Sequence, residues 1–158
     1  MMQAMAKKQE KTKNDAEAVE ETESSGSDCI FCKILNGDIP ARKFYEDDAA
    51  IAFLDINPAS PGHSLVVPRQ HFKTIADGEQ DVIAATFIAV KNVAELVKTR
   101  LQCDGLNIMA NQGRTAGQVI QHFHVHVVPR YKGDNIRIIP PDRKMSDEKL
   151  DEILEKLK

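Results

Sequence analysis

The feature that most constrains the fold is one long amphipathic stripe between two groups of short strand patterns. Apolar residues recur at alternating steps of four and three from Ile83 to Leu101, which is the spacing of one face of an α-helix. We expect the helix to begin near residues 77–79 and to end before Gly105. Its apolar positions are Ile83, Phe87, Val90, Ala94, Val97 and Leu101, and its water-facing positions include Lys91, Glu95 and Lys98.

Short runs of apolar and β-branched residues flank this helix pattern. Three precede it and two follow it, at residues 43–46, 49–54, 64–67, 106–110 and 123–128. Strands, then a helix, then more strands do not alternate as a parallel doubly wound sheet requires. We therefore predict an α+β fold with a roughly five-stranded antiparallel sheet and one long helix.

Composition divides the 158 residues into three parts. Residues 1–28 contain no Phe, Tyr, Trp, Ile or Leu, so they cannot bury enough apolar surface to offset the entropy of ordering. We expect a disordered charged tail there, a folded domain over residues 29–131, and a C-terminal extension over residues 132–158. The extension carries the apolar stripe of a short amphipathic helix at Leu150, Ile153, Leu154 and Leu157.

Charge and hydropathy exclude several classes of partner. The formal charge of −3 and the pI of about 6.0 provide no basic face for a nucleic acid polymer. No apolar run approaches the roughly 20 residues of a membrane span, and no apolar stretch marks a secretory signal. Three cysteines do not close a disulfide framework. We expect a cytoplasmic protein that binds a small ligand.

Three of the five histidines lie at alternate positions in the segment His-Phe-His-Val-His-Val-Val, which begins at residue 122. On a strand this spacing places His122, His124 and His126 on one face. A polar, solvent-facing strand is a poor explanation for three of five histidines in this alignment. The functional alternatives are a three-histidine metal site that activates water and attack on phosphorus by one neutral imidazole. Side chains on one strand run parallel rather than converging on an ion, so the spacing favours the nucleophile.

A loop rich in hydrogen-bonding side chains leads into the histidine strand. It runs from Asn111 to Gln118 and contains Gly113 and Gly117. Glycine allows the backbone to approach a ligand closely, and exposed amides suit phosphate oxygens. A plain linker is the alternative interpretation of this segment.

Together these residues resemble the histidine triad family of nucleotidyl hydrolases and transferases. The resemblance covers residues 29–131 and is nearest to the Hint-like branch whose members open with Cys-x-x-Cys. It implies a HIT-like fold with short N-terminal and C-terminal helices, and a symmetric homodimer. Besides the triad, Asn111 and residues 116–118, the matching stretches are 29–33, 37–40, 53–56, 61–63 and 66–69.

The resemblance also implies a role for each residue of the active site. His124 is expected to attack the α-phosphorus of a nucleotide and to form a nucleotidyl-histidine intermediate that water hydrolyses. His126 would assist the leaving group, and His63 would support the network from a neighbouring strand. Val119 departs from the Ser or Thr often found at its position, which puts the leaving-group preference in doubt. The expected nucleotide-binding residues are His124, His126, Asp55, Ile56, Asn111, Gly117, Gln118 and Val119.

Cys29 and Cys32 are, by spacing alone, half of a zinc site. A reduced buried pair and a redox couple are the alternatives. In relatives that share this opening, the pair binds zinc with two histidines, and the matching positions are His71 and His122. The resemblance therefore implies a structural zinc ion. Cys103 has no partner in this scheme and is interpreted as a packing residue.

The implied activity is hydrolysis at the α-phosphate of a purine nucleotide such as AMP or GMP, as in an adenosine 5′-monophosphoramidase. No cofactor is required for catalysis. A sister branch hydrolyses dinucleoside polyphosphates with the same nucleophile, so the sequence separates these activities poorly. The alternative from another class is a nucleotide-binding interaction module in which catalysis is incidental.

Overall fold

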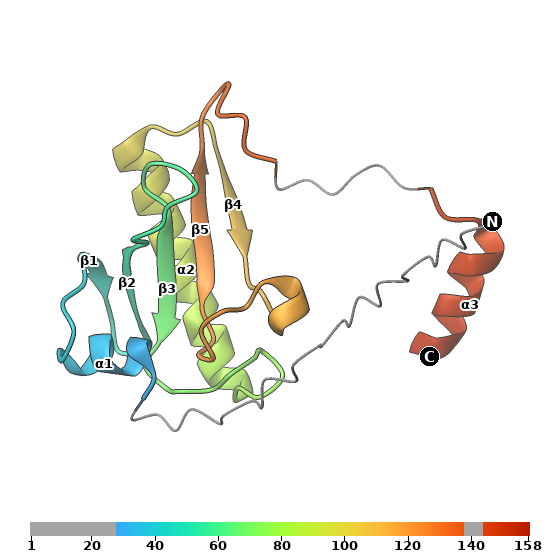
Figure 1. Cartoon of the computed structure of the whole chain (residues 1–158), viewed down its shortest axis with the longest axis horizontal. Coiled ribbons are helices and arrows are strands. Elements are labelled where there is room, and N and C mark those ends of the chain that lie inside the picture. Colours follow the sequence, from blue (N-terminus) through green and yellow to red (C-terminus); the bar gives the residue numbers. More distant parts are fainter. Residues whose placement is uncertain (1–27, 138–143) are drawn as a thin grey trace, which may run out of the picture.

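The structure is a computed structural model that describes residues 28–137 and 144–158. Five antiparallel strands form one open sheet in the order β1-β2-β3-β5-β4 (Figure 1), so the predicted α+β fold is confirmed. Residues 1–27 of the predicted tail lie outside the described residues. The strands are β1 (Lys43–Glu46), β2 (Ala50–Leu54), β3 (Ser64–Pro68), β4 (Gly105–Met109) and β5 (Val125–Arg130). The helices are α1 (Ile30–Asn36), α2 (Gln80–Leu101) and α3 (Asp147–Leu157), with a 3₁₀ turn at Arg114–Ala116.

Both faces of the sheet are covered. Alternate residues of β2 point to opposite faces: Ala52 packs in the cluster that includes α2, and Phe53 packs in the cluster that includes α1. β3 divides in the same way, with Val66 on the α2 face and Val67 on the α1 face. Because neither face meets water, these strands are continuous apolar runs rather than alternating ones.

The long helix lies where it was predicted, but its buried face is centred on smaller residues. Ala89, Val93 and Val97 are buried, whereas Phe87 and Leu101 are 39% and 43% exposed. The predicted apolar stripe is therefore buried along its centre and partly exposed at Phe87 and Leu101. Phe87 lies at the border of the stripe and tilts against Phe123, while Leu101 ends the helix and lies over the turn at Gly62.

The last strand begins two residues later than predicted, so His122 lies in a bend before it, His124 immediately precedes it, and His126 lies within it. The alternation nevertheless continues across this boundary. Phe123, like Val125, packs in the α2 cluster, and the ring of His124 packs edge-on against Phe31 of α1. The α1 face of the sheet is therefore the face that carries the site.

The predicted C-terminal helix is present as α3, capped by Ser146, whose side chain accepts a hydrogen bond from the Lys149 amide. Figure 1 shows α3 standing clear of the sheet, beyond the β4 edge. Among the described residues, none of the helices has the length and apolar character needed to cross a bilayer.

Candidate active site and metal centre

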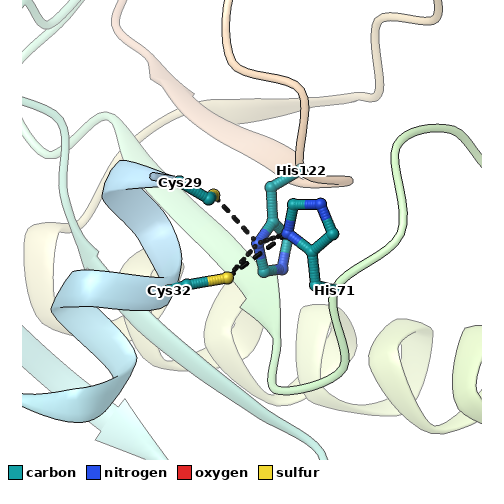
Figure 2. A group of neighbouring side chains, drawn as sticks. All are labelled: Cys29, Cys32, His71 and His122. Atoms are coloured by element: carbon teal, nitrogen blue, oxygen red, sulfur yellow. Dashed lines mark hydrogen bonds between the residues drawn. The ribbon is translucent and has the colours of Figure 1, made fainter. Parts of the chain in front are cut away.

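Two cysteines and two histidines from three parts of the chain converge beside α1 (Figure 2). Cys29 and Cys32 lie at the start of α1, His71 follows β3, and His122 precedes β5. One ligand atom from each residue lies within 4.8 Å of all the others. The structure thus brings together the four residues predicted to bind zinc.

The separations within this group match the edges of a zinc tetrahedron. Nδ1 of His122 is 3.4 Å from Cys29 Sγ and 3.5 Å from Cys32 Sγ. Nδ1 of His71 is 3.3 Å from Cys32 Sγ and 3.2 Å from Nδ1 of His122. Zn–S and Zn–N bonds of usual length give tetrahedral edges of about 3.5 Å between sulfur and nitrogen and about 3.4 Å between nitrogens. The four side chains therefore fit a closed zinc site, which leaves no position for substrate.

The protonation of the group also suits a cation. Nε2 of His122 donates to the Pro68 carbonyl at 3.0 Å, so the lone pair of the ring is on Nδ1, which faces the cysteines. Burial lowers the pKa of His122 to about 4, so the ring is neutral. Burial, together with neighbouring Cys29, raises the pKa of Cys32 to about 11. A bound zinc ion would displace that thiol proton, because thiolate is the form that ligates metal.

A cavity of about 430 Å³ lies next to this centre, on the α1 face of the sheet. Its volume is in the range of small-molecule sites. His124 and His126 reach it from β5 and the residues before it, and α1 supplies an apolar wall. Lining residues include Phe31, Ile34, Asp55, Ile56, Gly117 and Val119.

One hydrogen bond fixes which nitrogen of His124 carries the proton. Nδ1 lies 2.7 Å from the backbone carbonyl of His122, and a carbonyl oxygen can only accept, so Nδ1 holds the hydrogen. Nε2 of the neutral ring then carries a free lone pair. Burial lowers the pKa of His124, which keeps that lone pair available at neutral pH.

A chain of hydrogen bonds fixes the opposite tautomer in His126. The Ala59 amide donates to Nδ1 of His63 at 3.1 Å, so the hydrogen of His63 is on Nε2. That nitrogen lies 2.9 Å from Nδ1 of His126 and donates to it. The remaining nitrogen of His126, Nε2, must therefore carry a hydrogen. Of the two histidines at the cavity, one offers a lone pair and the other an N–H.

Asp55 is the acidic residue nearest to these rings. Its carboxylate lies 3.7 Å from Nδ1 of His63, which already accepts the Ala59 hydrogen. Burial lowers the pKa of His63, against the opposing effect of Asp55. Burial and then the neighbouring histidines lower the pKa of His126 to about 4. Asp55, His63 and His126 are close enough to hold a cation, but the hydrogen bonds already use the facing nitrogens.

The expected nucleotide-binding residues divide into two groups in the structure. Asp55, Ile56, Gly117 and Val119 line the cavity with the two histidines, and Ile56 and Val119 are more than 80% exposed at its mouth. Asn111 and Gln118 do not line it. Gln118 is buried, and its side chain accepts from the Gly113 amide and donates to the carbonyls of Lys73 and Ile120. These bonds shape the loop, so a direct contact between Gln118 and phosphate stays a prediction.

Comparison with known proteins decides the family. Residues 36–133 match the family model described as HIT domain. The chain belongs to the HIT family. An uncharacterized HIT-like protein of Methanocaldococcus jannaschii is 45% identical over 130 residues, which is 82% of this chain and 98% of that protein.

Two further relatives carry more specific names. A protein named adenylylsulfatase HINT3, from Arabidopsis thaliana, is 40% identical over 72% of this chain and 58% of its own length. The crystal structure of a zinc-bound histidine triad family protein from Mycobacterium smegmatis matches with a TM-score of 0.68 and 36% identity, over 84% of this chain and 97% of that one.

The wall that α1 builds in the HIT domain was not predicted. Phe31 and Ile34 lie in the cavity wall, and the Phe31 ring is 5.1 Å from the His124 ring, centre to centre. The only signal in the sequence was the position of these apolar residues immediately beside Cys32, where a metal would fix them. The hydrogen bond from the Ala59 amide to His63 was not predicted either, because the residue type does not reveal what a backbone amide will bind.

Proposed function

We propose that this HIT domain hydrolyses purine nucleotides that carry a leaving group on the α-phosphate, through a nucleotidyl intermediate on His124. The observation that carries the proposal is the pair of opposite tautomers at one cavity. A nucleophile needs a lone pair, which His124 Nε2 offers, and a departing group needs a hydrogen-bond donor, which His126 Nε2 offers.

In the first step Nε2 of His124 forms a bond to phosphorus while the bond to the leaving group breaks. The bonding pair departs with the leaving group, which for a phosphoramidate is an amine that takes up one proton from solvent while His126 Nε2 donates a hydrogen bond to it; the later attack of water releases one proton to solvent. The attacked ring becomes positively charged, and the His122 carbonyl at 2.7 Å from Nδ1 stabilises that charge through the existing hydrogen bond. Water then displaces the imidazole and returns a proton, so that one water molecule is consumed in each turnover.

The rest of the cavity is suited to a nucleoside. The apolar wall from Phe31 and Ile34, with Ile56 at the mouth, offers a surface for a purine base. Asp55 lines the same cavity and offers carboxylate oxygen to ribose hydroxyls. The relative named adenylylsulfatase supports a substrate whose leaving group is attached to an adenine nucleotide through its α-phosphate. An adenosine phosphoramidate is the substrate type that we favour.

Zinc would be held by Cys29, Cys32, His71 and His122 and would supply structure only, since the four ligands close its shell. Cysteine ligands must be reduced, which supports a cytoplasmic location. We also propose a homodimer. β4 is an edge strand of the described sheet, and Ile108 on it is 48% exposed, so pairing of two copies there would cover unpaired backbone groups.

The decisive experiment is intact-mass analysis after brief incubation with an AMP phosphoramidate and denaturation at neutral pH. We expect a nucleotidyl adduct on the wild type and on Gln121→Ala, a surface change next to the triad, and no adduct and no turnover with His124→Ala. Turnover that persists in His124→Ala would refute the proposed nucleophile. Parallel turnover of diadenosine tetraphosphate distinguishes the sister activity.

A further inference from the structure

The helix α3 has an apolar face with no partner among the described residues. Leu150, Ile153 and Leu154 are between 37% and 50% exposed, and Leu157 is 79% exposed. Figure 1 shows the helix clear of the sheet. An isolated helix of 11 residues is marginal in water. Packing of this apolar face is therefore what would stabilise the helix.

The domain has an apolar surface that also lacks a partner, which we name the α2 groove. It is a cavity of about 390 Å³ between the end of α2 and the strands β1, β2 and β3. Phe44, Leu54 and Leu101 in it are 37–43% exposed, and clustered exposed apolar residues mark interaction surfaces. The groove adjoins the triad cavity, because Arg42 and Leu54 line both. Its apolar lining comprises Phe44, Leu54, Leu96, Val97 and Leu101.

The charges of the groove and of the helix are complementary. The groove is lined by Arg42, Lys43 and Arg100, and by no acidic residue of the described chain. Successive residues of a helix turn by about 100°, which places Asp147 and Asp151 along one border of the apolar stripe. None of these five side chains has an ion pair among the described residues. Docking would therefore bring unpaired charges of opposite sign together.

The chain leaves the sheet beside this groove. Gly62 lines the groove, and a Cβ on it would lie 3.2 Å from Pro129 Cγ of β5. At the end of the same strand, the Tyr131 hydroxyl donates to the Pro61 carbonyl at 3.0 Å. The segment that leads from β5 to α3 thus starts next to one end of the groove.

The connection is long enough to bring α3 back to the groove of its own chain. Arg130 of β5 donates to the Ile136 carbonyl and to the Asn107 side chain on β4, so the chain passes β4 on its way to α3. The far side of the groove, at β1, is four strand spacings from β4, or roughly 19 Å. Ten Cα steps separate Arg137 from Asp147, and extended chain spans up to about 33 Å over that length. With two copies paired at β4, the partner's groove would be farther away than the chain's own.

We propose that α3 docks in the α2 groove of its own chain. The apolar stripe would cover the exposed apolar residues of the groove, and Asp147 and Asp151 would face its basic side chains. A short connection gives an effective concentration in roughly the millimolar range, so a shallow site is filled without a second copy. Because Arg42 and Leu54 also line the triad cavity, the docked helix would extend one wall of that cavity. The docking itself does not depend on the proposed nucleotide chemistry.

Isotope-mixed photo-crosslinking of the full chain tests the docking. The photoreactive residue p-benzoylphenylalanine replaces Leu154, and ¹⁴N and ¹⁵N chains are mixed, equilibrated and irradiated. We expect crosslinks to residues 42–54 or 96–101 that join peptides of the same isotope only, and few from the same probe at Glu152 on the polar face. Groove crosslinks that join different isotopes would show that a second copy fills the groove. An absence of groove crosslinks would show that α3 packs elsewhere, and either result overturns the proposal.

Charge reversal provides a second readout in the same assay. Asp151→Lys and Arg100→Glu are each expected to lower the yield of groove crosslinks about threefold, the effect of one partly exposed ion pair, and the double variant should restore it. Glu152→Lys makes the same change of charge on the polar face and should leave the yield near that of the wild type. Because these side chains are exposed, the fold tolerates the changes, which circular dichroism checks. Unchanged yields in both single variants would overturn the proposed docking.

Discussion

Removing zinc from its four proposed ligands is expected to release α1 and to weaken nucleotide binding while the sheet stays folded. Cys29 and Cys32 lie at the start of α1, and Phe31 and Ile34 of the same helix line the nucleotide cavity. The helix has seven residues, too few to be stable alone. The wall of the cavity therefore depends on whatever holds α1 to the sheet.

The size of the effect follows from burial. Ordering the backbone of α1 costs about 7–14 kcal/mol, at roughly 1–2 kcal/mol per residue. Burying Phe31 and Ile34, with the partly buried Cys32 and Leu35, stabilises it by about 5–9 kcal/mol. The deficit is a few kcal/mol, and zinc binding of about 10 kcal/mol or more exceeds it. Without the metal, α1 should detach.

The assay combines three measurements on chelated and zinc-loaded protein: metal content, hydrogen exchange of residues 29–36, and calorimetric affinity for AMP. We expect fast exchange in α1, at least about tenfold weaker AMP binding from the loss of two apolar contacts, and unchanged protection of β2 and β3. Cys103→Ala, which removes the thiol outside the metal group, should retain both zinc and affinity. Metal-free protein whose α1 amides stay protected would refute the reasoning.

Three smaller perturbations test other parts of the site. Burial lowers the pKa values of His63, His124 and His126. The value of kcat/KM should therefore be constant above pH 6.5 and fall at lower pH, with an apparent pKa between about 4 and 6.5. A fall that begins above pH 7 contradicts this expectation. His63→Ala removes the hydrogen bond of 2.9 Å between His63 Nε2 and His126 Nδ1. It should lower kcat about tenfold with little change in KM. A change in KM alone would show that His63 acts in binding. Gly62→Ala places a Cβ 2.2 Å from Leu101 Cδ1 at φ +89°. The backbone conformation alone should cost about 1–2 kcal/mol and lower Tm by several degrees. Gly133→Ala has a similar φ of +83° but open space around the Cβ, so it should lower Tm less, and equal losses would show that the contact with Leu101 costs nothing.

Features that depend on neighbouring residues in the sequence could be predicted. The period of α2 and the alternation around Phe123 are local, and both are present in the structure. The metal group is not local, since Cys29 and His122 are 93 positions apart. Only the resemblance to the histidine triad family joined them, because spacing identifies half of the site and says nothing about where the other half lies.

The exposure of Leu101 and the inward hydrogen bonds of Gln118 both depend on residues distant in the sequence. Helical periodicity gives the direction of a side chain but not the point at which the covering sheet ends. Leu101 therefore lies on the apolar stripe of the helix and is still nearly half exposed. A polar residue in a glycine-rich loop can bind either a ligand or its own loop. Gln118 uses its side chain on three backbone groups, a choice that depends on Lys73, 45 positions earlier in the chain.

The three histidines of the triad are chemically identical in the sequence and acquire different roles from backbone groups. The Pro68 carbonyl places the lone pair of His122 toward the metal ligands, and the His122 carbonyl places that of His124 toward the cavity. His122 thus acts twice, because its ring holds the metal group while its own carbonyl sets the tautomer of the next histidine. A displacement of His122 would disturb the metal centre and the orientation of His124 together. The proposed metal site and the proposed nucleophile are therefore linked through His122, and we expect loss of zinc to change the orientation of His124.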